Sequence, residues 1–191
     1  MNRQTIALWI SRLGHPFLIA PPALIYILWL GHVPLTNAIL WTILASTIVL
    51  VPCGLYITYH IRGGKFADFD VSVREHRPTL YLLGISSILL LLLLVFQLQA
   101  PAVLQDSLIA LTITMIVNGI INRWTKVSLH TATMAGIFML ILSQSLSWGL
   151  LAGLLSFAVG WSRVELQRHT LPQVILGWFV AVISVYLFFF L

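Results

Sequence analysis

Residues 79–98, TLYLLGISSILLLLLLVFQL, decide the fold class of this chain. The stretch contains no Lys, Arg, Asp or Glu, and a helix of its length spans about 30 Å, the thickness of the hydrocarbon core of a bilayer. The whole chain has the same character, with 60% hydrophobic and 8% charged residues and a mean hydropathy of +1.01. Because a helix satisfies its own backbone polar groups inside lipid, we predict an all-α integral membrane protein.

The apolar runs of the chain are separated by Gly, Pro or polar residues, which mark their ends. We predict one domain, residues 1–191, folded as a polytopic bundle of about six to seven transmembrane helices. The stretch 131–161 has two interpretations, a single long helix or a hairpin, and the polar residues 143–149 favour a turn. With the hairpin, the expected spans are 16–32, 37–60, 79–98, 102–121, 131–146, 148–161 and 171–190.

The first 14 residues differ from these spans, because Arg3 and Arg12 flank several apolar side chains. This pattern is typical of an amphipathic helix that lies in the membrane interface. No small-residue cleavage site follows, so we expect the segment to be retained. The single cysteine, Cys53, excludes an intramolecular disulfide.

Positive charge is distributed unevenly along the chain. If the seven expected spans alternate in direction, all 10 Lys and Arg residues fall on one side of the membrane. The positive-inside rule then places the N-terminus and this side in the cytoplasm. The basic residues stand beside apolar spans rather than on a broad polar face, so the sequence pI of about 9.9 does not indicate a nucleic-acid partner.

Three short clusters of basic residues and histidines follow the second, fourth and sixth expected spans, and therefore lie on the same side. They are residues 74–78 (Arg-Glu-His-Arg-Pro), residues 126–130 (Lys-Val-Ser-Leu-His), and Ser162-Arg163 with His169. Guanidinium groups and a hydroxyl can bind the oxygens of a phosphate, and two histidines can supply a nucleophile and a general acid. Asp68 and Asp70 are a weak signal for a divalent ion, so we expect neither metal nor cofactor.

The order and spacing of these residues resemble a known family. Ser162-Arg163 and His169 resemble the third motif of the type 2 phosphatidic acid phosphatases, the lipid-phosphate branch of the vanadium haloperoxidase superfamily. Residues 128–130 are similar to the second motif, Pro-Ser-Gly-His, and residues 77–78 to the end of the first, Lys, six residues, Arg-Pro. The resemblance covers roughly residues 60–180.

The resemblance implies a metal-independent phosphatase that acts on a membrane lipid phosphate or prenyl phosphate. His169 would attack phosphorus to form a phosphohistidine, and His130 would protonate the leaving alkoxide and then activate water. The oxygens of the phosphate would be held by Arg77, Arg163 and Ser128.

Several residues depart from the family motifs. Asp70 stands where the family has lysine, so we expect Arg74 to replace that charge, with Lys126 or Lys65 as further donors. Leu129 replaces the glycine of the second motif. Gln173 stands four residues after His169, where the family has an aspartate that orients the nucleophile, and the Gln173 carbonyl can accept the same hydrogen bond.

Other interpretations remain open for the same residues. Arg74 and Arg77 can be topological anchors, and His130 and His169 can be interfacial caps. The remaining histidines at 15, 32, 60 and 76 are interpreted as interfacial. Asn118 and Asn122 can bond between helices or line the approach of a substrate.

Two further functions use the same scaffold. In one, the phosphohistidine passes its phosphoryl group to an acceptor alcohol rather than to water. In the other, the protein binds or transports a lipid phosphate without turnover, which the departures at Asp70, Leu129 and Gln173 make credible. Phosphatidic acid, phosphatidylglycerol phosphate and prenyl mono- or diphosphates are all candidate substrates.

Overall fold

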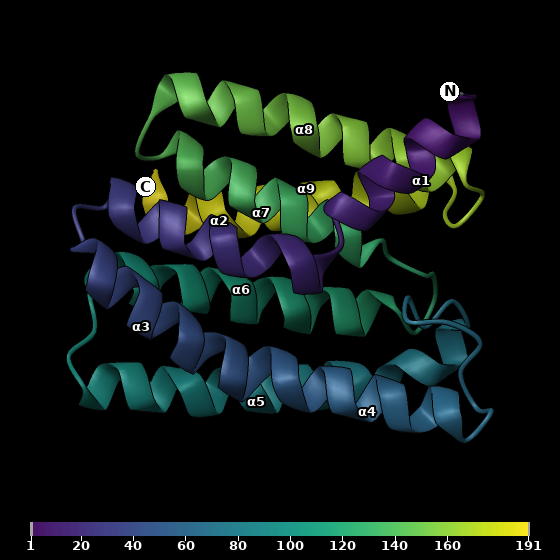
Figure 1. Ribbon diagram of the computed structural model, residues 1–191, viewed down its shortest axis with the longest axis horizontal. Helices are drawn as coiled ribbons and strands as arrows, with labels where there is room; N and C mark the ends of the chain where they lie inside the picture. Colours follow the sequence, from purple (N-terminus) through teal and green to yellow (C-terminus); the bar gives the residue numbers. More distant parts are fainter. Residues whose placement is uncertain (1, 191) are drawn as a thin grey trace.

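Helices account for all the regular secondary structure of residues 2–190, the part of the chain that the computed structural model describes. The long helices lie side by side along the longest axis of the molecule (Figure 1). Their bounds are α1 Arg3–Leu13, α2 Pro16–Leu30, α3 Leu35–Ala45, α4 Val51–Arg62, α5 Arg77–Gln97, α6 Ala102–Ile121, α7 Leu129–Leu142, α8 Leu146–Glu165 and α9 Leu171–Phe189. The prediction of an all-α chain is confirmed for these residues.

A short π-helical segment, η1 (Ser46–Leu50), joins α3 and α4 into one continuous helix of 28 residues. The segment ends two residues before Pro52, which has no N–H to donate to the carbonyl one turn earlier. The Val51 N–H bonds instead to the Ser46 carbonyl. A 3-10 turn, η2 (Arg74–His76), leads into α5.

Four helical segments are long and apolar enough to cross a bilayer, namely Leu35–Arg62, Arg74–Gln97, Ala102–Ile121 and Leu171–Phe189. Helices α1 and α2 are bent by 56° relative to each other, and if this pair counts as one broken span, the number of candidate spans rises to 5. Helix α7 has only 14 residues, about 21 Å at 1.5 Å per residue, which is shorter than the hydrocarbon core. The chain is therefore compatible with an integral membrane protein of four or five such helices.

Residues 131–161 form a hairpin, as the polar residues at their centre predict. Helix α7 ends at Leu142 and α8 begins at Leu146. The two helices approach closely at Gly149, where an added Cβ would lie 2.5 Å from the Leu142 Cα. The prediction of a turn is confirmed, and the alternative of one long helix is wrong.

Helix α1 packs against α8 rather than standing apart from the bundle, and Arg3 pairs with Glu165 at 2.9 Å. Its buried face carries Ala7 and Ser11, while Trp9 and Leu13 remain exposed. The interfacial location expected for residues 1–14 remains a prediction.

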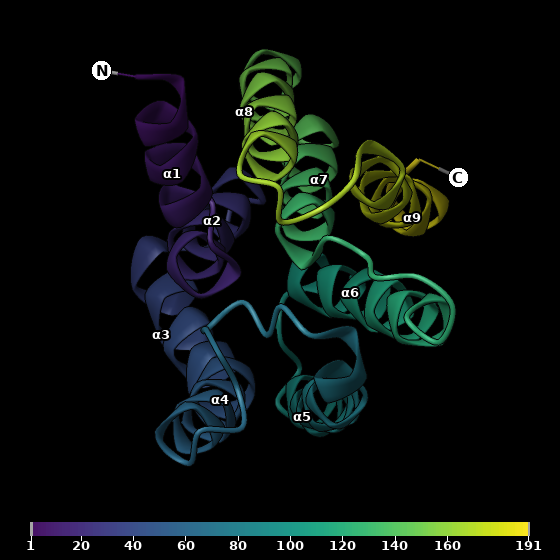
Figure 2. The same cartoon turned by 90° about the vertical axis from the view of Figure 1, so that its right-hand side faces the viewer.

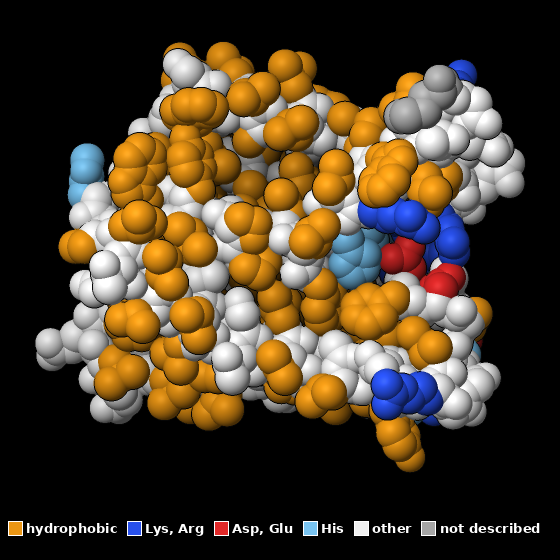
Figure 3. All heavy atoms as spheres, in the orientation of Figure 1, with side chains coloured by type: hydrophobic (Ala, Val, Ile, Leu, Met, Phe, Trp, Pro, Cys, Tyr) orange, Lys and Arg blue, Asp and Glu red, His pale blue; other side chains and the backbone are white. Residues whose placement is uncertain are grey.

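Charged side chains gather at one end of the bundle, while the rest of the visible face is mostly hydrophobic (Figure 3). The connections from α4 to α5, from α6 to α7 and from α8 to α9 meet at this end, which faces the viewer in Figure 2. Hydrogen bonds described below join all three connections. The three sequence clusters therefore converge, which is what a common site requires.

Candidate functional site

Arg77, the first residue of α5, joins two of the converging connections. Its Nε donates to the Val71 carbonyl at 2.9 Å, its Nη1 to the Val127 carbonyl at 2.8 Å, and its Nη2 to the Asp70 carbonyl at 3.2 Å. The side chain is only 3% exposed. Of the five N–H groups of a guanidinium, two remain for another acceptor. Arg77 therefore holds the backbone of the site in place and still has donors to offer to an anion.

Ser128 caps the N-terminus of α7 and connects it to α9. Its Oγ accepts a hydrogen bond from the Thr131 N–H at 3.4 Å, and its backbone N–H donates to the backbone carbonyl of Gln173 at 3.4 Å. Helix α9 approaches this segment at Gly177, where an added Cβ would lie 2.7 Å from the Ser128 carbonyl oxygen. Ser128 is completely buried, and the α9 backbone is close enough to fix its position.

His169 lies in the connection between α8 and α9, and its Nδ1 is 3.1 Å from the Gln173 Oε1. The same Oε1 accepts a hydrogen bond from the Thr170 N–H at 3.3 Å, as part of a capping box at the start of α9. Because an atom that accepts from a backbone N–H must be the carbonyl oxygen, Nδ1 of His169 must carry the proton. The lone pair of the neutral imidazole is then on Nε2, as a nucleophile requires.

Several positive groups lie near His169. Burial, followed by the charges of Lys126, Arg77 and Arg163, lowers the pKa of His169 to about 3, against a small opposing effect of Gln173. Burial and the charges of Arg77 and Arg163 also lower the pKa of Lys126. The site therefore has an excess of positive charge, which an anion would compensate.

Arg163 of α8 carries a second buried charge next to this histidine, with its side chain 3% exposed. Its Nη1 donates to the Ser11 Oγ at 2.6 Å and its Nη2 to the Asp70 Oδ2 at 2.7 Å. Its Nε is buried without a partner among the described residues. Three of its five N–H groups thus remain for an anion, although a carboxylate already occupies one side of the guanidinium.

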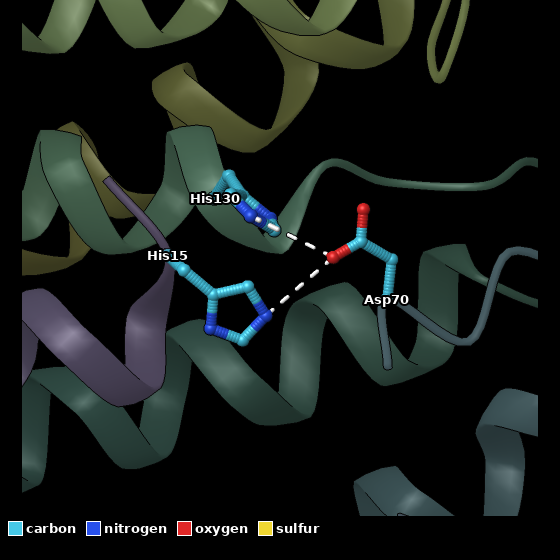
Figure 4. Close-up of side chains that lie close together, drawn as sticks. All are labelled: His15, Asp70 and His130. Atoms are coloured by element: carbon cyan, nitrogen blue, oxygen red, sulfur yellow. Dashed lines mark ion pairs between the residues drawn. The ribbon is translucent and has the colours of Figure 1, made fainter. Parts of the chain in front are cut away.

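Asp70 pairs with Arg163 on one side. On the other side it faces His15, at the junction of α1 and α2, and His130 of α7 (Figure 4). Its Oδ1 is 3.5 Å from the His15 Nε2 and 3.8 Å from the His130 Nε2. The two imidazole rings meet edge to face, with centroids 4.8 Å apart. The Asp70 pKa lies well below its usual value. Burial alone would raise this pKa, but the hydrogen bond from His15 and the charge of Arg163 outweigh burial.

His15, Asp70 and His130 are residue types that can bind a metal ion, and one potential ligand atom from each lies within 4.8 Å of the others. Two features favour a hydrogen-bonded group instead. The His15 Nδ1 accepts the Phe17 N–H at 3.3 Å, so the proton of the neutral ring is on Nε2, the atom that would have to bind a metal. Arg163, moreover, lies on the same carboxylate and would repel a cation.

Arg74 and Lys126 both bond to the backbone of neighbouring connections. Arg74 pairs with Glu75 at 3.1 Å and donates to the Arg123 carbonyl at 3.0 Å. The Lys126 Nζ donates to the Ser72 carbonyl at 3.1 Å. Arg74 thus braces one connection against another, and its expected role of replacing the missing lysine remains a prediction.

An apolar cavity of about 180 Å³ lies in the bundle among α2, η1, α6, α7 and neighbouring helices. Leu129, between Ser128 and His130 in the sequence, lines it, so the cavity extends to the first residue of α7. Asn118 also lines it, and both polar atoms of this completely buried amide lack a partner among residues 2–190. A cavity of about 150 Å³ holds a benzene ring, so this one can hold a short length of hydrocarbon chain.

Two site residues were not identified from the sequence. His15, interpreted as interfacial, contacts Asp70 and His130, and Ser11 binds Arg163. The available signal was that both precede the first span on the charged side of the bundle. From the sequence, Asp70 was interpreted as a departure from the first motif and, with Asp68, as a weak signal for a divalent ion, whereas the structure places it between Arg163 and two histidines.

No family model, curated protein or solved structure matches this chain.

Proposed function

We propose that this protein is a divergent member of the type 2 phosphatidic acid phosphatase family and hydrolyses a membrane lipid phosphate or prenyl phosphate through a phosphohistidine. The observation that carries the proposal is the environment of His169. Its Nε2 is unprotonated when the ring is neutral, because Gln173 accepts the Nδ1 proton, and positive groups surround it. A neutral imidazole among cations suits attack on a phosphate.

The reaction has two steps. In the first, the Nε2 lone pair of His169 forms a bond to phosphorus while the bond from phosphorus to the lipid oxygen breaks, and His130 gives its Nε2 proton to that oxygen. In the second, His130 takes a proton from water as the oxygen attacks phosphorus, which breaks the phosphorus–nitrogen bond. Phosphate leaves, and both histidines return to their starting states.

The oxygens of the phosphate would be held by N–H groups that the protein has not used. Arg163 has three and Arg77 has two, and Lys126 adds a charge nearby. Both arginines are buried, so their charge is screened less than a surface charge would be. Removing one such donor costs about 100-fold or more in rate in comparable sites.

The apolar cavity beside Leu129 supports a lipid as the substrate, because a hydrocarbon chain there would leave the phosphate at the charged end of the bundle. We infer about six or seven spans. Lys and Arg gather at the charged end, so the positive-inside rule places this end in the cytoplasm. Cysteine labelling tests the orientation. In a Cys53→Ser background, Arg62→Cys should react with an impermeant reagent only from the cytoplasmic side, and His32→Cys only from the other.

Phosphate release from phosphatidic acid, phosphatidylglycerol phosphate and prenyl phosphates, measured in detergent with a chelator, tests the proposed function. We expect turnover by the native protein and none by His169→Ala. A phosphorylated alcohol as the product would instead indicate a transferase, and tight binding without turnover would indicate a lipid-phosphate binder or transporter. Full activity in His169→Ala would contradict the proposed mechanism.

A further inference from the structure

We infer that Asp70 and His15 are positioning residues: Asp70 favours the protonated form of His130 and aims it at the leaving oxygen, and His15 helps to hold Asp70 in place, so that the carboxylate serves the general acid rather than the nucleophile. The inference rests on the proposed function. It starts from the replacement in this chain of the motif lysine by Asp70 and of the motif aspartate by Gln173.

The charges around His130 make a nearby carboxylate necessary. His130 is 5% exposed, and its Nε2 has no hydrogen-bond partner among the described residues. Arg163 and His169 come from α8 and its connection to α9, His15 from the junction of α1 and α2, and Asp70 from the connection before α5. Burial, followed by the charge of Arg163, lowers the pKa of His130 well below its usual value, and of these four groups only Asp70, with its negative charge, opposes this and favours the imidazolium that a general acid must be.

Hydrogen bonds fix the direction of this carboxylate. Arg163 donates to Oδ2 at 2.7 Å, which turns Oδ1 towards the two histidines. His15 accepts the Phe17 N–H at its Nδ1, so the neutral ring presents an Nε2–H to Oδ1 at 3.5 Å. The His130 Nε2 lies 3.8 Å from the same oxygen (Figure 4). Asp70 is thus held from two sides, and its free lone pairs face His130.

Asp70→Asn removes the charge with little change in shape, and Asp68→Asn is a matched control from the same connection. For a lipid phosphate, we expect kcat to fall about 10-fold or more, since general acid catalysis contributes about 10²- to 10⁴-fold. KM should fall as well, because a negative charge next to the bound phosphate is lost. The midpoint of the basic limb in the pH profile of kcat should move to lower pH by about 1 unit or more, because the protonated form of His130 loses its negative neighbour.

An aryl phosphate with a weakly basic leaving group separates positioning from structure, because it needs no proton from His130. We expect Asp70→Asn to leave the first-turnover burst of p-nitrophenol release from p-nitrophenyl phosphate within about 3-fold of native, a loss of less than about 1 kcal/mol, because this step needs no general acid. Steady-state turnover is not used, because His130 also activates water in the second step. An equal loss with both substrates, or an unmoved basic limb, would overturn the inference and leave Asp70 as a partner of Arg163 only.

His15 gives a second test that does not remove the partner of Arg163, in case Asp70→Asn does not fold. His15→Leu should lower kcat for the lipid phosphate, and His15→Gln, which keeps an N–H donor, should restore part of it. NMR titration of the His130 ring in native protein and Asp70→Asn needs no turnover. If the titration midpoint of His130 is lower in Asp70→Asn but no substrate is hydrolysed by the native protein, the proposed function fails while the pairing of Asp70 with His130 stands. An unchanged midpoint overturns the inference.

Discussion

The Nδ1 of His169 lies 3.1 Å from the Oε1 of Gln173, four residues later on the first turn of α9. The Thr170 N–H donates to the same oxygen at 3.3 Å, so the amide orientation and the histidine tautomer are determined together. One side chain thereby caps a helix and directs the lone pair of the proposed nucleophile away from the cap. A neutral amide achieves this without adding charge beside the imidazole.

Gln173→Leu should reduce phosphatase activity about 5-fold, because the hydrogen bond that sets the tautomer is worth about 1 kcal/mol. Loss of the capping box should also destabilise the protein by about 1 kcal/mol. Gln173→Glu keeps the cap and adds a charge, so it should raise the pKa of His169 from about 3 by about 1 to 3 units. Enzyme kinetics and chemical unfolding measure the two effects of Gln173→Leu, and NMR titration of His169 measures the effect of Gln173→Glu. Native activity in Gln173→Leu would contradict the claim that Gln173 sets the tautomer of His169.

The stability of the fold should depend on pH through His169. Its pKa falls from 6.5 to about 3 on folding, so between these values the unfolded state binds a proton that the folded state does not. The free energy of unfolding should therefore decrease as pH falls from 6.5 towards 3, and His169 should contribute no pH dependence above that range. Denaturant unfolding of native protein and His169→Phe measures this, with His32→Phe as an exposed control. An equal slope in native protein and His169→Phe would contradict the assignment.

Arg77 should be required for folding as well as for phosphate binding. Arg77→Met leaves the carbonyls of Val71, Asp70 and Val127 without their donor. Arg77→Lys should not restore these bonds, because the single ammonium group of lysine does not reproduce the planar arrangement of the guanidinium N–H groups. We expect each variant to lose about 3 kcal/mol of unfolding free energy or more. The exposed Arg62→Ala should change it by no more than about 0.5 kcal/mol. A native midpoint for Arg77→Lys in chemical unfolding would refute this role.

Two glycines test whether α9 must approach Ser128 closely. At Gly177 an added Cβ lies 2.7 Å from the Ser128 carbonyl oxygen and 3.0 Å from a Val127 methyl, whereas at Gly136 no atom lies within 4 Å. Gly177→Ala should cost about 1 to 3 kcal/mol and lower kcat, since the strain falls on a site segment. Gly136→Ala should be neutral or slightly stabilising, because alanine favours a helix. Equal effects of the two substitutions would contradict the close approach.

The helices and their common charged end were predictable from local pattern. The expected span 102–121 coincides with α6, and the turn expected near Ser143 ends α7. Counting crossings then predicted that the clusters around Arg77, Ser128 and Arg163 meet, because each follows a span in the same direction. The count of seven spans is not confirmed, since α7 is short for a bilayer.

The contacts of Asp70 were not predictable in the same way. His15 lies beside an apolar run, and that local pattern is the same for an interfacial histidine and for one turned into a site. Its pairing with Asp70, and the bond between Ser11 and Arg163, depend on how α1 packs against α8 at long range. Periodicity and motif spacing carry no information about such packing, so a carboxylate first identified as a departure proved to be the central anion.

In the proposed mechanism, His169 forms a bond to phosphorus. The most direct measurement is to mix the protein with ³²P-labelled phosphatidic acid, quench under alkaline conditions that preserve phosphohistidine, and locate the label by mass spectrometry of peptides. We expect label on His169 in the native protein and none in His169→Ala. In His130→Ala with a ³²P-labelled aryl phosphate, label on His169 should accumulate, because His130 is not there to activate water. Label on another residue, or turnover with none on His169, would contradict the proposed mechanism.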